Sequence, residues 1–245
     1  MTNGILDSSQ KIVTNGLVLN YDIAQLRSYP TTGTNITDLS GNNNNGTLVN
    51  GVAFNSNNGG SLAFDGINDY VTTSFTSTAM YNISIWFYTP SQILSGKNPV
   101  GYGGLGYYGT SGTKTRYDGF SFGDYTGVGA NETISYYQEN PQQIIYITNV
   151  IPIGYTNIVM NYNDVDLTYD FYLNGIKVTR YIGTTGAIPL FYTNIITLGS
   201  TGDPTTVGAG YYGSIRTSIV QVYNRSLSAA EVLQNFNANR SRYGL

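Results

Sequence analysis

Side chains able to perform chemistry on a substrate are few in this sequence. Its 245 residues include no histidine and no cysteine. The chain therefore lacks an imidazole base, a thiolate nucleophile, and the nitrogen and sulfur ligands that most often hold zinc, copper or iron. What remains is carboxylate chemistry, the binding of a hard metal ion by oxygen ligands, or binding without catalysis.

Carboxylates are the remaining candidates for catalysis. Glycoside hydrolysis requires two of them across a cleft, roughly 5 to 9.5 Å apart. The chain has only three glutamates, and they do not form the Glu-x-Asp-x-x-Glu pattern that places catalytic carboxylates on one face of a strand. Asp164 and Asp166 lie in a segment, 161–166, that is typical of a turn before a hairpin. The sequence therefore predicts a protein that is not an enzyme.

Oxygen ligands for a cation gather in one predicted turn. Asp65, Asn68 and Asp69 lie within residues 64–69, and Asp22 follows the first predicted strand. Calcium prefers carboxylate, amide and carbonyl oxygens on loops, so calcium is the one cofactor that these residues could hold. Asp and Asn also favour turns through hydrogen bonds to their own backbone, without any metal. Both interpretations stay open.

Tyrosines form a third group of candidate site residues. They cluster with glycine in residues 101–109 and recur as doublets later in the chain, at Tyr102, Tyr107, Tyr108, Tyr136, Tyr137, Tyr211 and Tyr212. Tyrosine among glycine, serine and asparagine makes an adaptable contact surface at low entropic cost. These rings could be buried along strands, stack on sugars, or bind a neighbouring protein subunit. Of the two binding interpretations, we favour the protein contact.

Composition limits the class of partner. Charged residues make up 10% of the chain, against roughly 25% in an ordinary soluble domain. The net charge of −3 excludes the broad basic surface that nucleic acids require. No apolar stretch approaches the roughly 20 residues of a membrane span, and residues 1–10 lack the features of a signal peptide. A surface of Asn, Thr, Ser, Gly and Tyr without a secretion signal is compatible with a virion component released by host lysis.

The elements that must position these residues are short strands. Apolar, β-branched and aromatic runs recur between Gly, Asn, Asp and Pro clusters, which predicts an all-β fold of two antiparallel sheets. The pair Asn174-Gly175 between two alternating segments predicts a tight hairpin. In the strand over 82–89, alternation places Ile83, Ile85 and Phe87 in the core, with Trp86 packing on the opposite face.

One helix is expected, at the end of the chain. Ser228 and Glu231 have the spacing of a capping box, and Leu227 and Val232 that of a hydrophobic staple. These signals predict a helix over 228–240, docked on a sheet. We expect an N-terminal arm over 1–14 and one domain over 15–245.

Three passages resemble the laminin G-like jelly-roll family of the concanavalin A-like lectin and glucanase superfamily. They are residues 64–71, residues 83–89, and residues 172–175 together with 222–231, where a strand leads into the capped helix. The opening at 12–22, with 28–30 and 38–47, and the ending at 234–244 resemble virion proteins of tailed bacteriophages. The segment 101–129 is longer and richer in Gly and Tyr than this family pattern.

The resemblance implies a jelly-roll sandwich on the virion surface, most simply a capsid decoration or head-fibre subunit. It implies other virion proteins and further copies of the chain as partners. The alternative is a carbohydrate-binding adhesin that contacts a host surface glycan. No nucleic acid and no membrane span are expected.

Overall fold

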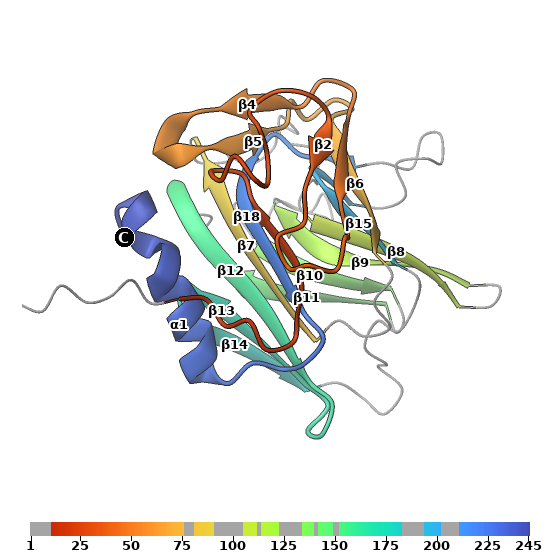
Figure 1. The fold of residues 1–245 in the computed structure, drawn as a ribbon. Helices are drawn as coiled ribbons and strands as arrows, with labels where there is room; N and C mark the ends of the chain where they lie inside the picture. The colour runs from red at the N-terminus through yellow and green to blue at the C-terminus, as the bar shows by residue number, and fades with distance from the viewer. Residues whose placement is uncertain are drawn as a thin grey trace, which may run out of the picture.

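Two β-sheets packed face to face form the body of the protein (Figure 1). The computed structural model describes residues 11–75, 81–90, 105–111, 114–122, 134–139, 142–148, 152–182, 194–201 and 211–245. Within these ranges the strands pair antiparallel, apart from one parallel bridge between Ser200 and Leu105, and one α-helix lies near the C-terminus. The predicted all-β sandwich with a C-terminal helix is confirmed.

The first sheet has eight strands. Seven follow the order β14 (Ile176–Ile182), β13 (Thr168–Leu173), β12 (Gly154–Asn163), β7 (Asn82–Thr89), β18 (Arg216–Tyr223), β5 (Ser61–Ala63) and β4 (Ala53–Asn55). The eighth, β1 (Leu17–Asp22), also pairs with β18. The first and last parts of the chain therefore meet in the middle of this sheet.

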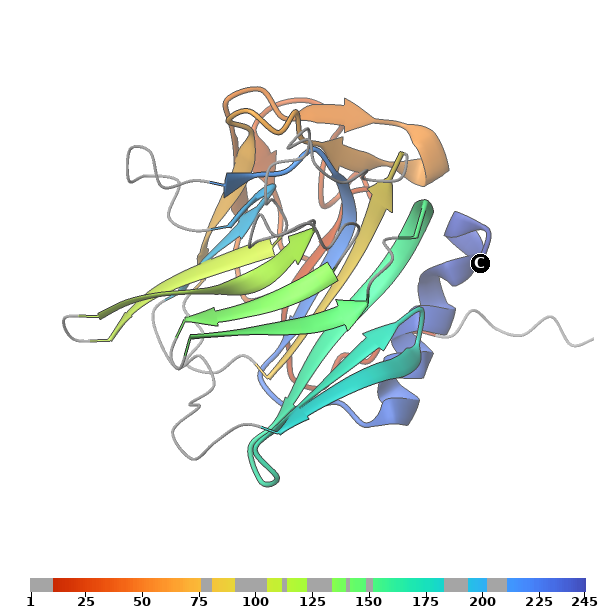
Figure 2. The same cartoon turned by 180° about the vertical axis from the view of Figure 1, so that it is seen from behind.

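The second sheet has ten strands. Eight follow the order β11 (Gln142–Thr148), β10 (Ile134–Glu139), β9 (Lys114–Phe122), β8 (Leu105–Ser111), β15 (Asn194–Leu198), β6 (Tyr70–Phe75), β3 (Gly46–Val49) and β2 (Asn35–Ile36). Two short strands, β16 (Ser200–Thr201) and β17 (Tyr211–Tyr212), extend it. Seen from behind, this sheet lies on the side of the eight-stranded sheet that faces away from the helix (Figure 2).

The core lies between the two sheets because apolar residues alternate along the strands. Ile83, Ile85 and Phe87 of β7 are buried there, as the alternation predicts. Trp86 points the other way and is 1% exposed, packed between Phe236 and Tyr243 at ring-centroid distances of 5.5 and 4.5 Å. The packing interpretation of Trp86 is therefore confirmed, and its partners are at the C-terminal end of the chain.

The predicted hairpin joins β13 and β14. Asn174 and Gly175 have positive φ angles of 49° and 76°, the backbone conformation that an Asn-Gly turn favours. A Cβ on Gly175 would lie 3.1 Å from Leu233 and 3.0 Å from Phe236, so glycine also lets the hairpin approach the helix closely.

The described part of the chain has no helix long and apolar enough to cross a membrane.

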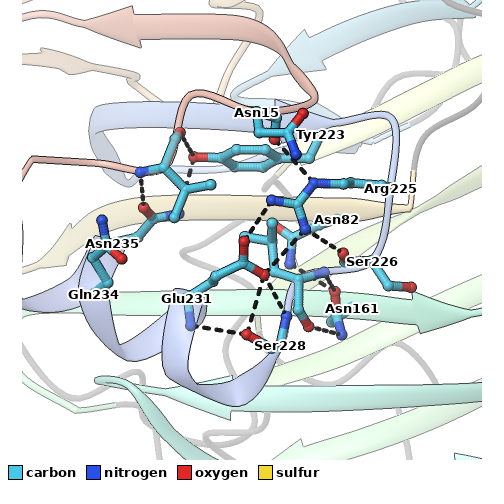
Figure 3. Close-up of polar contacts among 12 residues, drawn as sticks. Asn15, Asn82, Asn161, Tyr223, Arg225, Ser226, Ser228, Glu231, Gln234 and Asn235 are labelled. Atoms are coloured by element: carbon cyan, nitrogen blue, oxygen red, sulfur yellow. Dashed lines mark hydrogen bonds and ion pairs between the residues drawn. The ribbon is translucent and has the colours of Figure 1, made fainter.

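The helix α1 (Ala229–Arg240) covers part of the outer face of the eight-stranded sheet and continues into the short 3₁₀ helix η2 (Ser241–Tyr243). Its capping box is confirmed, since Ser228 Oγ accepts from the Glu231 N–H while Glu231 accepts from the Ser228 N–H. Arg225 donates to both carboxylate oxygens of Glu231, at 2.5 and 3.0 Å, and so ties the helix start to the end of β18 (Figure 3). Leu227 and Val232 pack in one buried cluster, as a hydrophobic staple requires.

Residues 11–15 form hydrogen bonds with this helix and with the residues that precede it. The N–H of Val13 donates to Asn235 Oδ1 at 2.7 Å, and its carbonyl accepts from the Tyr223 hydroxyl at 2.9 Å (Figure 3). Gln234 donates to the Lys11 carbonyl, and Arg225 donates to that of Asn15. These contacts attach residues 11–14 of the predicted arm to the body; residues 1–10 lie outside the described residues.

Candidate binding site at the end of the sandwich

The turn between β5 and β6 has the geometry that its Asp and Asn residues favour. Asp65 Oδ1 accepts from the N–H of Ile67 at 2.8 Å and more weakly from that of Asn68 at 3.4 Å. Gly66 takes a positive φ of 78° and lies against Ser214. The Asp65 side chain thus organises the turn and leaves Asn68 and Ile67 exposed.

Asp69 lies at the end of this turn and is buried. It is only 5% exposed, and its Oδ2 accepts from the Asp65 N–H at 3.3 Å. Burial, and then the nearby negative charge of Asp65, raise the pKa of Asp69 above its usual value. Asn50, from the preceding β-turn, donates its side-chain amide to the Asn68 carbonyl at 2.8 Å and braces the turn from outside.

An aromatic pair adjoins the turn. Tyr70 follows Asp69 directly, and its ring centroid lies 6.4 Å from that of Tyr212 in β17. Both rings are half-buried, and burial followed by the proximity of Tyr70 raises the pKa of Tyr212. We call Asp65, Asn68, Asp69, Tyr70 and Tyr212 the rim site. It combines half-exposed aromatic rings with carboxylate and amide oxygens.

The structure separates the predicted tyrosines. Tyr107 and Tyr108 lie within strand β8 instead of a loop, where the register pairs them with Ile196 and Ile195. Tyr137 pairs with Gly119 in the same sheet, and Tyr211 with Thr201. Tyr102 lies outside the described residues.

Tyr136 is a core residue, which corrects its prediction as a contact residue. It is 1% exposed and packs against Phe120, Tyr169 and Phe171 between the two sheets. The sequence doublet Tyr136-Tyr137 spans both faces of a strand, so only one of its members could face outward. Of the two predicted tyrosines whose exposure the structure describes, Tyr212 is the half-exposed one, and its ring lies beside that of Tyr70.

The four predicted calcium ligands are not brought together. Asp22 forms a bidentate ion pair with Arg242 of η2, at 2.7 and 3.1 Å, and also accepts from the Gln25 side chain. Asp65, Asn68 and Asp69 do share one turn. Calcium usually takes six to eight oxygens. Among the described residues, no group of three or more acidic, His or Cys side chains is placed to hold a metal. The turn therefore fits calcium only in part, through two carboxylates and the oxygens of Asn68.

Sequence reasoning did not identify Tyr70 as a site residue. Its neighbours Asp65 and Asp69 are recognisable because a short turn motif contains them. Tyr70 contacts Tyr212 because β17, which is far from Tyr70 in the sequence, lies beside it in the folded chain. No local pattern contains that pairing.

Comparison with known proteins gives no family, because no family model and no curated protein matches the chain. Solved structures do match it. Domain 4 of an extracellular arabinanase from Geobacillus stearothermophilus, solved in complex with arabinotriose, aligns at a TM-score of 0.60 and 14% identity, over 89% of this chain and 97% of that one. The likeness is one of fold.

Two larger proteins share the same fold. The binding domain of Paraclostridial Mosquitocidal Protein 1 aligns at a TM-score of 0.61 and 15% identity, covering 92% of this chain and 52% of that one. Trypanosoma rangeli sialidase, in complex with sialic acid, aligns at 0.63 and 14%, covering 93% and 33%. The chain thus spans about half of the toxin binding domain and a third of the sialidase. A β-sandwich of this type occurs in binding domains and within glycosidases.

Proposed function

We propose that this protein is a non-enzymatic binding module whose ligand is a carbohydrate held at the rim site. The observation that carries the proposal is the half-exposed pair Tyr70–Tyr212 directly beside the Asp65–Asp69 turn. Carbohydrate sites combine an aromatic surface for the apolar face of the sugar with a few fixed polar groups for its hydroxyls. The rim site supplies both kinds of group within one turn and one neighbouring strand.

The absence of catalysis is part of the proposal. Asp65 is committed to its own turn, and Asp69 is buried and accepts from the Asp65 N–H, so the two do not present free carboxylates across a cleft. Arabinotriose is the first sugar to test, since the arabinanase domain of the same fold was solved with it. Binding without release of new reducing ends is the expected result.

The direct experiment is saturation-transfer NMR with arabinotriose and an array of bacterial surface oligosaccharides. Tyr212→Ser should weaken binding of any sugar that the wild type retains by about tenfold, a loss of roughly 1.4 kcal/mol. Tyr181→Ser is the matched control, because Tyr181 is also half-buried but lies on the edge strand β14. Equal loss in both variants, or none in Tyr212→Ser, would contradict the rim site.

A second candidate is the virion subunit that the sequence resemblance implies, bound to other proteins at the capsid or fibre surface. One observation favours a protein contact: apolar side chains are exposed on β14 and the adjoining face of α1. They are Ile176 and Ile182 at 69%, Val178 at 43% and Leu233 at 44%. Exposed apolar patches of this kind often mark protein interfaces.

This second candidate is tested on the particle. If the chain decorates a virion through β14, Ile176→Ser with Val178→Ser should lower its occupancy on purified particles, and a density map should place β14 against a neighbouring subunit. Tyr212→Ser should leave occupancy unchanged. The reverse pattern would exclude β14 as the contact.

A further inference from the structure

A strip of the outer face of the eight-stranded sheet lies beyond the end of the C-terminal helix. There, five neighbouring strands contribute one residue each to a row that crosses the sheet. The row, fixed by strand register, is Ala53, Ala63, Arg216, Tyr88 and Tyr155. Ala53 is exposed, while Ala63, Arg216 and Tyr88 are half-buried. The two alanines therefore place short side chains next to the long side chain of Arg216.

The Arg216 side chain lies over the ring of Tyr88. Its guanidinium carbon lies 4.3 Å from the ring centroid of Tyr88, within the range of a cation–π contact. The N–H donors of a stacked guanidinium point sideways, in its own plane, and remain able to bind an oxygen pair. Arg216 is therefore pre-organised for a planar, bidentate ligand.

The charge of Arg216 is not neutralised within the described part of the chain. Arg180, Arg225 and Arg242 each form an ion pair with a carboxylate, at 2.5 to 2.7 Å. Arg216 has no such partner among those residues; its contact is the Tyr88 ring. In a protein with a net charge of −3, an arginine that lies over an aromatic ring and has no acidic partner among the described residues is suited to an external anion.

Aromatic rings extend this platform toward the helix. Tyr88 packs on Tyr155 at 5.0 Å, and Tyr155 packs on Tyr243 at 4.4 Å. The Tyr155 hydroxyl points to the Asn57 carbonyl at 3.5 Å, which brings the exposed turn at η1 (Asn57–Gly59) beside the row. The strip thus combines a cation, tyrosine rings, two alanine side chains and a neighbouring polar turn.

We propose that the Arg216 row binds a carboxylated sugar residue, a uronic acid of an acidic glycan. The carboxylate takes the two in-plane N–H groups of Arg216, while the sugar ring lies over Ala63 and the edge of Tyr88. The inference rests on the proposed carbohydrate-binding function, but it uses a different surface from the rim site and adds the charge of the ligand.

The test is calorimetric titration of the whole chain with trigalacturonate and with its neutral methyl ester. The acid should bind the wild type, and Arg216→Gln should lower its affinity by at least about tenfold. The ester should bind at least about tenfold more weakly than the acid. Arg27→Gln is the matched control, because Arg27 is exposed and also lacks a carboxylate partner among the described residues. An unchanged melting temperature verifies that Arg216→Gln folds; if it does not fold, Tyr88→Leu replaces it.

Four results overturn the inference. One is equal binding of the acid to the wild type and Arg216→Gln; a second is equal binding of the acid and its ester. A third is tighter, Arg216-dependent binding of a short polyglutamate peptide, which would make the ligand an acidic peptide. The fourth is no binding of trigalacturonate at all. If a neutral sugar still binds in a Tyr212-dependent manner, only the Arg216 row fails; if no sugar binds, the proposed function fails with it.

Discussion

For Asp69, burial and the binding of a cation would favour opposite protonation states of the carboxyl group. Burial and the neighbouring Asp65 raise its pKa, so the folded protein favours the protonated form more than the unfolded chain does. An acid of this kind costs stability above its folded pKa, and the cost disappears as the pH falls below the ordinary value near 4. A bound cation would reverse the preference, because it would favour the ionised carboxylate.

Replacing Asp69 separates these two cases. In EDTA at pH 7, Asp69→Asn should raise the melting temperature, and the gain should vanish near pH 3.5. If calcium binds the turn, adding it at pH 7 should raise the melting temperature of the wild type but not of Asp69→Asn. A lower melting temperature for Asp69→Asn in EDTA would show that the ionised carboxylate is stabilising without a metal.

Glu231 has the opposite electrostatics. Its hydrogen bonds from Arg225, and further ones from Ser228, lower its pKa to about 2. A depressed pKa contributes stability above the unfolded value of 4.5, and this contribution is lost as the pH falls toward 2. Glu231→Gln should therefore cost about 1 to 3 kcal/mol at pH 7 and progressively less below pH 4.

Ser228→Ala provides the comparison. It removes the hydroxyl that accepts from the Glu231 N–H and donates to Glu231 Oε2 at 3.1 Å, at a cost of about 1 kcal/mol that should change less with pH than the cost of Glu231→Gln, because the Arg225 ion pair remains. Denaturant unfolding of both variants at pH 7, 4 and 2.5 measures the difference. A pH-independent cost for Glu231→Gln would show that the ion pair with Arg225 contributes nothing.

At the scale of elements, η2 completes the helix by covering Trp86. Tyr243 packs against Trp86 and Tyr155 and donates its hydroxyl to Ser218 at 2.8 Å, while Arg242 pairs with Asp22. Tyr243→Ala should cost about 3 to 5 kcal/mol, as the loss of a buried aromatic ring does. Because Trp86 is the only tryptophan of the chain, its fluorescence should shift to the red at the same time.

The control for Tyr243→Ala is Arg240→Ala. Arg240 is exposed on the same helix, so its loss should change stability by less than about 0.5 kcal/mol and leave the emission unchanged. Unaltered Trp86 emission in Tyr243→Ala would mean that η2 does not shield the indole ring.

Elements with a local signal are those that the sequence predicts. The Ser228–Glu231 box and the Asn174-Gly175 turn are each specified within a few residues, and both are confirmed. The Asp65–Asp69 turn is recognisable for the same reason. Contacts between distant segments have no such signal: the attachment of Val13 to Asn235, the cover of Trp86 by Tyr243, and the approach of Tyr70 to Tyr212 depend on which faces the sheets bring together. The doublet Tyr136-Tyr137 likewise does not show which of its members faces the core.

At the scale of the whole molecule, tyrosine is the most abundant titratable residue. The chain has 23 tyrosines and no histidine. At ordinary pKa values, no side chain changes its charge between about pH 5.5 and 8. The melting temperature should therefore be nearly flat across that interval, apart from any contribution of Asp69, whose pKa is raised.

Alkaline pH should end this plateau. Burial raises the pKa of Tyr243 to about 12 and raises those of Tyr21 and Tyr223 further. A folded pKa above the unfolded value of 10 means that the folded protein retains protons that the unfolded chain releases. Stability is therefore fully present below pH 10 and is lost as the pH rises through the folded pKa values. Tyrosinate absorbance and circular dichroism recorded together between pH 8 and 12.5 provide the measurement. We expect the exposed rings to ionise first and the buried rings only as the sheets unfold, in one cooperative step; smooth ionisation of all tyrosines near pH 10 with intact dichroism would contradict their burial.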